Sequence, residues 1–386
     1  MEKSNEMLMK PFSRVLAELD NPYVRDQREK GRKVIGFFCS YIPMELIAAA
    51  GAVPFRIKGS PGRDIGIGTT YLSSRLCTFS RNALTLVLEN DYSFLNGFVG
   101  CNTCDHIRRA SQNWIVKKPA NFTHFIHIPR VYGGENISFF RDQVMHLRRE
   151  LEQWSGKTIS DDDIREASLK YNRARGTLRK LSALRKQDKP ALSGSEMLAI
   201  SVAYHQMPVD DFNAAAEPLL ESVLGEKSAN KGRSGKARLL LCGGMIDEPD
   251  YVAFIEEQGI DIVADAVCFG IRSYWDDVDM NQEPMEAIAE RSLTHFPCPH
   301  IGDSFERRWD TIRRIYDDYR ADGIIFQKLK FCQIWGVDSY NMTPRCEELA
   351  IPFLSLEREY GFFSTGQVKT RLQAFTELIE ERKAAV

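Results

Sequence analysis

Three cysteines, Cys77, Cys104 and Cys332, have the residue type and the local contexts that predict one shared soft-metal site. Cys104 follows the apolar stretch 94–99, and Cys332 follows a second apolar stretch, 323–329. A cysteine just beyond a strand, in a chain with no sign of a secretory signal, favours metal ligation or catalysis over a disulfide. The two ends of the chain are therefore expected to contribute to the same site.

Cys101 and Cys104 form a Cys-x-x-Cys pair. Such a pair is typical of a zinc half-site, a dithiol redox pair or part of an iron-sulfur site, and its spacing leaves these open. A tetrahedral zinc site needs a second pair, and none follows. A thioredoxin-type pair belongs to a smaller single domain. Taken alone, Cys101 is also consistent with a buried thiol in a tight turn.

Cys77 lies near the predicted start of a helix, whose partial positive charge favours the thiolate. Taken alone it is better interpreted as a core cysteine, and only the other two cysteines favour its role as a ligand. Glu45 is interpreted as a solvated helix carboxylate rather than a cleft acid. The segment 295–300, with two histidines and Cys298, is predicted to be a loop and not a ligand set.

The other cysteines considered are interpreted as structural, and those in strands as small buried hydrophobic side chains: Cys39, Cys242, Cys268 and Cys346.

Short β-rich runs alternate with longer helical runs, which predicts parallel sheets covered by helices. Strands are expected near 34–39, 53–57, 94–99, 122–128, 239–242, 260–267, 323–327 and 351–356. Helices in the first half are expected to begin at Pro43, Thr70 and Thr103. Because ligands collect beyond the carboxyl ends of parallel strands, two such sheets facing one another bring Cys104 and Cys332 to a common cleft.

The pattern predicts three segments: a first α/β domain over 1–132, a helical insertion and linker over 133–236, and a second α/β domain over 237–386. Strand signals vanish between about 134 and 224, where charged helical periodicity takes over. The stretch 225–238 is rich in Gly, Ser, Lys and Asn and is interpreted as the linker.

Composition excludes several classes of function. The chain has 386 residues, with 51 Lys and Arg against 53 Asp and Glu, so no overall basic field favours nucleic acid. No apolar run approaches the roughly 20 residues that span a bilayer, so we expect no membrane segment and a cytoplasmic location. The run 232–237 lacks P-loop spacing, so any ATP is expected on another subunit.

Several segments together resemble the 2-hydroxyacyl-CoA dehydratase and benzoyl-CoA reductase family. They are the run 36–51, Cys104-Asp105, the segment 322–332, and the C-terminal segment 351–357 with Thr370-Arg371. The resemblance covers nearly the whole chain and keeps the order of the motifs.

The resemblance implies two flavodoxin-like, doubly wound domains with a helical insertion. It also implies a 4Fe-4S cluster in the interdomain cleft, held by Cys77, Cys104 and Cys332. The spacing from 77 to 104 is short for some members, which leaves Cys101 as a replacement for one of them.

The resemblance further implies a heterotetrameric complex. It contains a homologous cluster-bearing subunit and activator subunits that hydrolyse ATP with Mg²⁺; ferredoxin is the indirect electron donor and an aromatic acyl-CoA the substrate. The segments 38–40 and 359–361 are most similar to the smaller of the two cluster-bearing polypeptides, the C subunit, of the ATP-dependent benzoyl-CoA reductases, which dearomatise benzoyl-CoA to a cyclohexadiene. The alternatives are a dehydratase subunit that expels water from a 2-hydroxyacyl-CoA by radical chemistry, and a non-catalytic electron-relay subunit.

Overall fold

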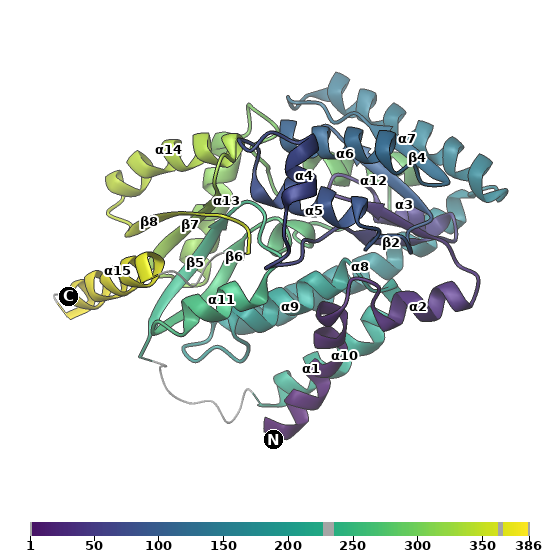
Figure 1. Cartoon of the computed structure of the whole chain (residues 1–386). Helices are drawn as coiled ribbons and strands as arrows, with labels where there is room; N and C mark the ends of the chain where they lie inside the picture. Colours follow the sequence, from purple (N-terminus) through teal and green to yellow (C-terminus); the bar gives the residue numbers. More distant parts are fainter. Residues whose placement is uncertain (1, 227–234, 362–365, 385–386) are drawn as a thin grey trace.

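Two parallel sheets of four strands each form the framework of the chain in a computed structural model, which describes residues 2–226, 235–361 and 366–384 (Figure 1). The first sheet has the order β2-β1-β3-β4, and the second has the equivalent order β6-β5-β7-β8. The strands are β1 (Val34–Phe37), β2 (Val53–Arg56), β3 (Gly97–Cys101), β4 (Phe122–Ile126), β5 (Ala237–Gly243), β6 (Ile260–Ala266), β7 (Gly323–Leu329) and β8 (Phe353–Arg358). The predicted α/β class with two flavodoxin-like sheets is confirmed.

Helices cover both sheets. They are α1 (Glu2–Ala17), α2 (Pro22–Glu29), α3 (Met44–Ala49), α4 (Gly66–Tyr71), α5 (Thr78–Leu88), α6 (Asp105–Lys117), α7 (Gly134–Ser155), α8 (Asp161–Ala183), α9 (Gly194–Tyr204), α10 (Val209–Glu226), α11 (Pro249–Glu256), α12 (Pro284–Thr294), α13 (Phe305–Asp318), α14 (Gln333–Glu348) and α15 (Gly366–Ala384), with short 3₁₀ turns at Leu184–Lys186 and Ile271–Ser273. The prediction that a helix begins at Thr70 is wrong. Instead α4 ends at Tyr71 and α5 begins after a turn, at Thr78.

The strands lie where continuous apolar runs can be buried on both faces, as parallel sheets require. Every residue of β1, β3 and β5 is buried. In each sheet, the second strand along the chain pairs with one edge of the first strand, and the third strand pairs with the other edge. The direction in which strands are added therefore reverses between β1 and β3 in one sheet and between β5 and β7 in the other. The carboxyl ends at such a reversal are the usual place for a ligand.

The predicted helical insertion corresponds to α7 to α10, which lie between the two sheets in sequence. Helix α8 packs on α3 and α12, while α9 packs on α11 and β6, so these helices contact both halves of the molecule. Capping boxes at Ser160 and Ser193 fix the starts of α8 and α9. The boundaries between the three predicted segments stay a prediction. Residues 227–234, which hold most of the predicted linker and the start of the run 232–237, lie outside the described residues.

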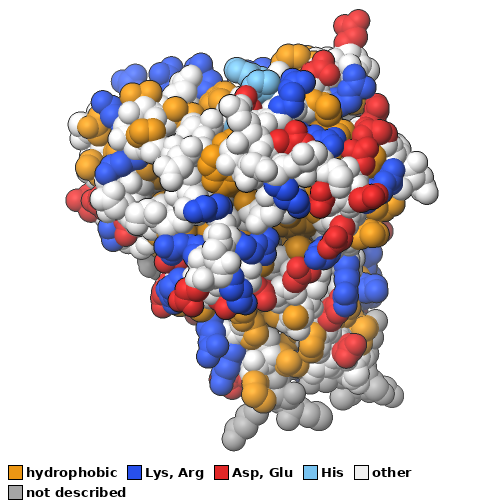
Figure 2. All heavy atoms as spheres, turned by 90° about the vertical axis from the view of Figure 1, so that its right-hand side faces the viewer, with side chains coloured by type: hydrophobic (Ala, Val, Ile, Leu, Met, Phe, Trp, Pro, Cys, Tyr) orange, Lys and Arg blue, Asp and Glu red, His pale blue; other side chains and the backbone are white. Residues whose placement is uncertain are grey.

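Charged side chains of both signs are interspersed over the face shown in Figure 2, together with scattered hydrophobic ones. This surface agrees with the near balance of charges in the sequence. Among the described residues, no helix is both long enough and apolar enough to cross a membrane.

The imidazole of His124 on β4 lies against His146 of α7, with 5.1 Å between the ring centroids. Burial, aided by His146 and His127, lowers the pKa of His124 to about 4 from 6.5. The native state therefore keeps this ring neutral while the unfolded chain takes up a proton below pH 6.5. Between these two pKa values, protonation of His124 in the unfolded chain should lower the free energy of unfolding by about 1.4 kcal/mol for each unit by which the pH falls.

Because glutamine does not titrate, we expect His124→Gln to lose this pH dependence of the free energy of unfolding. The difference in that free energy between the wild type and the variant should therefore become smaller as the pH falls. Anaerobic urea unfolding at several pH values in this range measures it. A constant gap contradicts the lowered pKa.

Candidate functional site: a thiol-lined cavity between the two sheets

A cavity of about 80 Å³ lies where the carboxyl ends of the two sheets meet. Its wall combines thiols, aromatic and aliphatic side chains, and one guanidinium. The lining residues are Phe38, Cys39, Arg56, Cys77, Phe79, Thr103, Cys104, His106, Ile107, Gly244, Met245, Cys268, Cys298, Leu329, Cys332, Ile334 and Trp335. Both halves of the chain contribute, and none of these residues is Asp or Glu.

The structure brings Cys77, Cys104 and Cys332 to this one wall, as the sequence predicts. Each of them occupies the N-cap position of a helix: Cys77 for α5, Cys104 for α6 and Cys332 for α14. The positive ends of three helices therefore point toward the cavity, an arrangement that favours negative charge inside it.

Backbone contacts fix the positions of these thiols. Cys104 Sγ accepts a hydrogen bond from the Ile107 amide at 3.3 Å, and the Cys77 amide donates to His106 Nδ1 at 3.2 Å, which ties α5 to α6. Phe331 adopts a left-handed backbone with φ of 66° immediately before Cys332. Such a conformation is uncommon for a bulky residue, and it turns the chain sharply between β7 and α14.

The thiols interact electrostatically with one another. Burial raises the pKa of Cys104, and the neighbouring Cys77 and Cys332 raise it further. Burial also raises the pKa of Cys77, while hydrogen bonds from Ser80 and the charge of Arg81 act in the opposite direction. A metal bound at these sulfurs would hold them in the deprotonated form that ligates it.

Three further cysteines, Cys39, Cys268 and Cys298, line the same cavity. The sequence favours a structural interpretation of Cys39 and Cys268, and that interpretation misses their place on the cavity wall. Both follow a strand closely, β1 and β6, so the rule applied to Cys104 and Cys332 could have found them. Cys298 lies in the segment 295–300, which the structure confirms as a loop. Its cysteine and two histidines are the signal that could have pointed to the cavity, although the sequence favours a loop over a ligand set.

Cys101, Cys242 and Cys346 are buried away from the cavity wall. Cys101 ends β3, and its sulfur lies 3.5 Å from Thr103 Oγ1. A hydrogen bond with Cys101, together with the charge of Arg56, lowers the pKa of Cys39. Cys101 thus supports a wall residue rather than lining the cavity itself, which leaves Cys77 as the better partner for Cys104 and Cys332.

No group of three or more Cys, His, Asp or Glu among the described residues is close enough to hold a single metal ion. Thiols are nevertheless the ligand type that iron-sulfur clusters use, and each iron of a cluster takes its own thiolate. Arg272 Nε, beside this wall, is buried without a hydrogen-bond partner. The donor set and the unsatisfied cation therefore fit an anionic iron-sulfur group.

Glu45 is neither a solvated carboxylate nor a cleft acid. It is 1% exposed and pairs with the equally buried Arg175, Oε1 to Nη1 at 2.6 Å. The pKa of Glu45 is lowered, because the attraction of Arg175 and Arg291 outweighs the desolvation that opposes it. The pair joins α3 to α8 and is structural.

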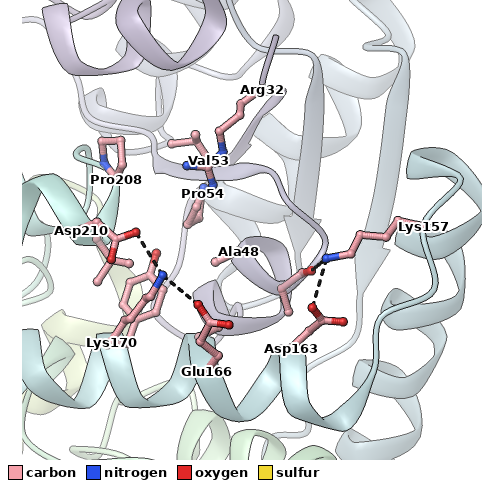
Figure 3. A pocket seen from close by; sticks show the side chains of 14 residues that line it. Arg32, Ala48, Val53, Pro54, Lys157, Asp163, Glu166, Lys170, Pro208 and Asp210 are labelled. Carbon is pink, nitrogen blue, oxygen red and sulfur yellow. Dashed lines mark hydrogen bonds and ion pairs between the residues drawn. The ribbon is translucent and has the colours of Figure 1, made fainter. Parts of the chain in front are cut away.

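A separate, polar pocket lies between α3, α8 and α10 (Figure 3). Lys170 points to Glu166 and Asp210, at 3.1 and 3.2 Å, and Lys157 lies 3.2 Å from Asp163. The charges of both lysines are therefore already matched by neighbouring carboxylates. This pocket offers much weaker grounds for a ligand than the thiol-lined cavity.

Fold and site together define a two-sheet α/β protein that directs thiols from both halves into one interior cavity. The model of a known family, described as 2-hydroxyglutaryl-CoA dehydratase, D-component, matches residues 39–379. The chain belongs to this family. The resemblance stated from the motifs is confirmed.

Three relatives with named activities are similar to this chain over most of their lengths. The (R)-phenyllactyl-CoA dehydratase beta subunit of Clostridium sporogenes is 26% identical over 94% of this chain and 96% of its own length. The C subunit of the benzoyl-CoA reductase of Thauera aromatica is 24% identical over 88% and 89%. The beta subunit of the (R)-2-hydroxyglutaryl-CoA dehydratase of Acidaminococcus fermentans is 22% identical over 96% and 98%. These relatives are subunits of dehydratases and a reductase of CoA thioesters.

Proposed function

We propose that the chain is the iron-sulfur subunit of a multi-subunit, oxygen-sensitive enzyme that acts on CoA thioesters. Cys77, Cys104 and Cys332 are its proposed cluster ligands. The observation that carries the proposal is the convergence of these three thiols, each at the start of a helix, on one cavity without carboxylates.

When bound, a 4Fe-4S cluster supplies electrons singly at low potential. The chain's own contribution is to shield that site. Phe38, Phe79, Ile107, Leu329 and Trp335 form much of the cavity wall, and all are buried. Such a wall excludes water, which would otherwise compete for a strongly reducing electron.

Within the family we propose the role of a benzoyl-CoA reductase subunit. The partners would be a homologous cluster-bearing subunit and an ATP-hydrolysing activator that takes its electrons from ferredoxin. Two electrons and two protons added to the aromatic ring give the cyclohexadiene thioester. The 24% identity to a reductase subunit supports this role, while the 26% identity to a dehydratase subunit supports the alternative equally well.

Reconstitution of the purified subunits under argon tests the reaction. With benzoyl-CoA, ATP and reduced ferredoxin we expect a cyclic diene. Loss of water from a 2-hydroxyacyl-CoA, with benzoyl-CoA unchanged, would establish the dehydratase instead. A substrate-induced spectral change confined to the sister subunit's cluster would identify this chain as an electron relay.

The six thiols on the wall exceed what one cubane needs, which favours a second candidate for the cofactor: a larger iron-sulfur group that also uses Cys39, Cys268 and Cys298. Iron and sulfide analysis separates the two. About four of each per chain means one cubane, and about twice that content means that both sets of thiols are ligands.

A further inference from the structure

Several arginines buried elsewhere in the molecule hold carboxylates, whereas Arg238 and Arg291 donate to backbone carbonyls. The carboxylate pairs include Arg175 with Glu45, Arg185 with Asp265, Arg308 with Asp338 and Arg358 with Glu248. The reason is energetic, since a charge taken out of water without a counter-charge costs several kcal/mol. A buried guanidinium that lacks a carboxylate and lies beside a cavity is therefore a candidate to balance the charge of what the cavity holds.

Arg56, at the end of β2, is such a residue. It is 1% exposed and lines the thiol cavity. Nε donates to Phe38 O at 3.1 Å, Nη1 donates to Cys268 O at 2.8 Å, and Nη1 also lies 3.1 Å from His205 Nε2. The guanidinium carbon lies 4.1 Å from the centroid of the Phe269 ring. Burial lowers the pKa of His205 well below its usual value, so every one of these partners is neutral.

Arg272 is the second arginine beside the cavity that lacks a carboxylate partner. It lies behind Cys268 and Trp335, two residues of the cavity wall: Nη1 is 3.4 Å from Cys268 Sγ, and the guanidinium is 5.3 Å from the Trp335 ring centroid. Its Nε is buried without a partner. Within the described part of the chain, neither Arg56 nor Arg272 has a carboxylate oxygen within 4.0 Å.

Two cations thus flank a cavity whose wall has no carboxylate. Their main charge partners are thiols of the same wall, Cys298 and Cys268 for Arg272 and Cys39 and Cys268 for Arg56, so both cations face sulfur atoms rather than carboxylates. An occupant that brings negative charge would balance them, and a cubane held by thiolates is negatively charged and gains another negative charge on reduction.

We propose that Arg56 and Arg272 are positioning residues that neutralise the iron-sulfur group in this cavity and raise its reduction potential. The proposal rests on the cofactor stated under Proposed function and extends it to residues that are not ligands. Its physical basis is Coulombic: a nearby buried cation stabilises the reduced, more negative form more than the oxidised form.

The test is a potentiometric titration of the anaerobic chain, followed by electron paramagnetic resonance, for the wild type, Arg56→Met and Arg272→Met. Each variant removes a charge but keeps a long side chain. We expect each to disfavour reduction at least tenfold, which is a fall of about 59 mV for a one-electron couple. Arg56→Lys keeps the charge and should stay close to the wild type.

Arg238→Met is the matched control. Arg238 is 2% exposed and donates to backbone carbonyls of Gln187, Arg185 and Tyr319, but it is the second residue of β5, at the opposite end of the sheet from the cavity. Its loss should leave the potential unchanged. A fall equal to that in Arg56→Met would show a general effect of lost buried arginines and overturn the proposal.

The remaining outcomes are also decisive. Unchanged potentials in Arg56→Met and Arg272→Met, with full iron content, overturn this inference alone. A wild-type chain that holds no iron overturns the proposed cofactor and the inference with it. If Arg56→Met fails to fold, Arg272→Met and Arg56→Lys still decide, because the first should lower the potential and the second should not.

Discussion

Replacing Cys332 with alanine should remove most of the iron, and most of the visible absorbance, from the anaerobically purified chain. Cys332 is the ligand proposed from the second sheet, and it lies on the cavity wall with Cys77 and Cys104. Iron analysis and the absorption spectrum measure the loss.

Cys346→Ala is the control for this prediction. Cys346 lies on the same helix, α14, but is buried away from the cavity, so its variant should keep both iron and colour. Equal iron in the two variants would remove Cys332 from the ligand set. Cys268→Ala adds a further distinction, because iron loss there as well would indicate that both sets of thiols bind.

Replacing Glu45 with glutamine should lower the free energy of unfolding by about 3 to 5 kcal/mol, because it leaves the buried Arg175 guanidinium without its counter-charge. Both side chains of the pair are 1% exposed. Urea unfolding near neutral pH, under anaerobic conditions, measures the change.

Glu166→Gln provides a matched comparison, since Glu166 pairs with Lys170 on the exposed face of α8. An exposed pair of this kind is worth only about 0.5 kcal/mol. Similar losses in the two variants would show that burial of the Glu45 pair has no special energetic role.

The strands were predictable because their signal is local. A fully buried run such as β5 has few alternatives to a parallel strand, and Cys104 and Cys332 could be placed because each follows such a run. The helix starts were less predictable. Thr70 and Thr78 are both reasonable first residues, and in the structure the Cys77 amide, just before α5, donates to His106 of α6, a tertiary contact that the sequence does not reveal.

Much of the site arises only when the sheets come together. Arg56 occupies a strand position where a charged residue suggests an exposed edge, yet the second half of the chain buries it. Cys298 is far from any strand, and Glu45 looks like a surface residue until α8 brings Arg175 to it. Sequence spacing reports none of these contacts, because the partners are distant along the chain and their burial depends on tertiary packing.

The contribution of both halves to one cavity has a mechanical consequence. The proposed cluster, bound by Cys77 and Cys104 on one side and by Cys332 on the other, would cross-link the two halves of the chain and, by mass action, stabilise the folded arrangement in which they meet. Oxidative loss of that cluster should then weaken the contacts between the two halves of the chain and make the residues between them accessible to proteases. Destruction of the cofactor by air would in this way also mark the polypeptide for removal.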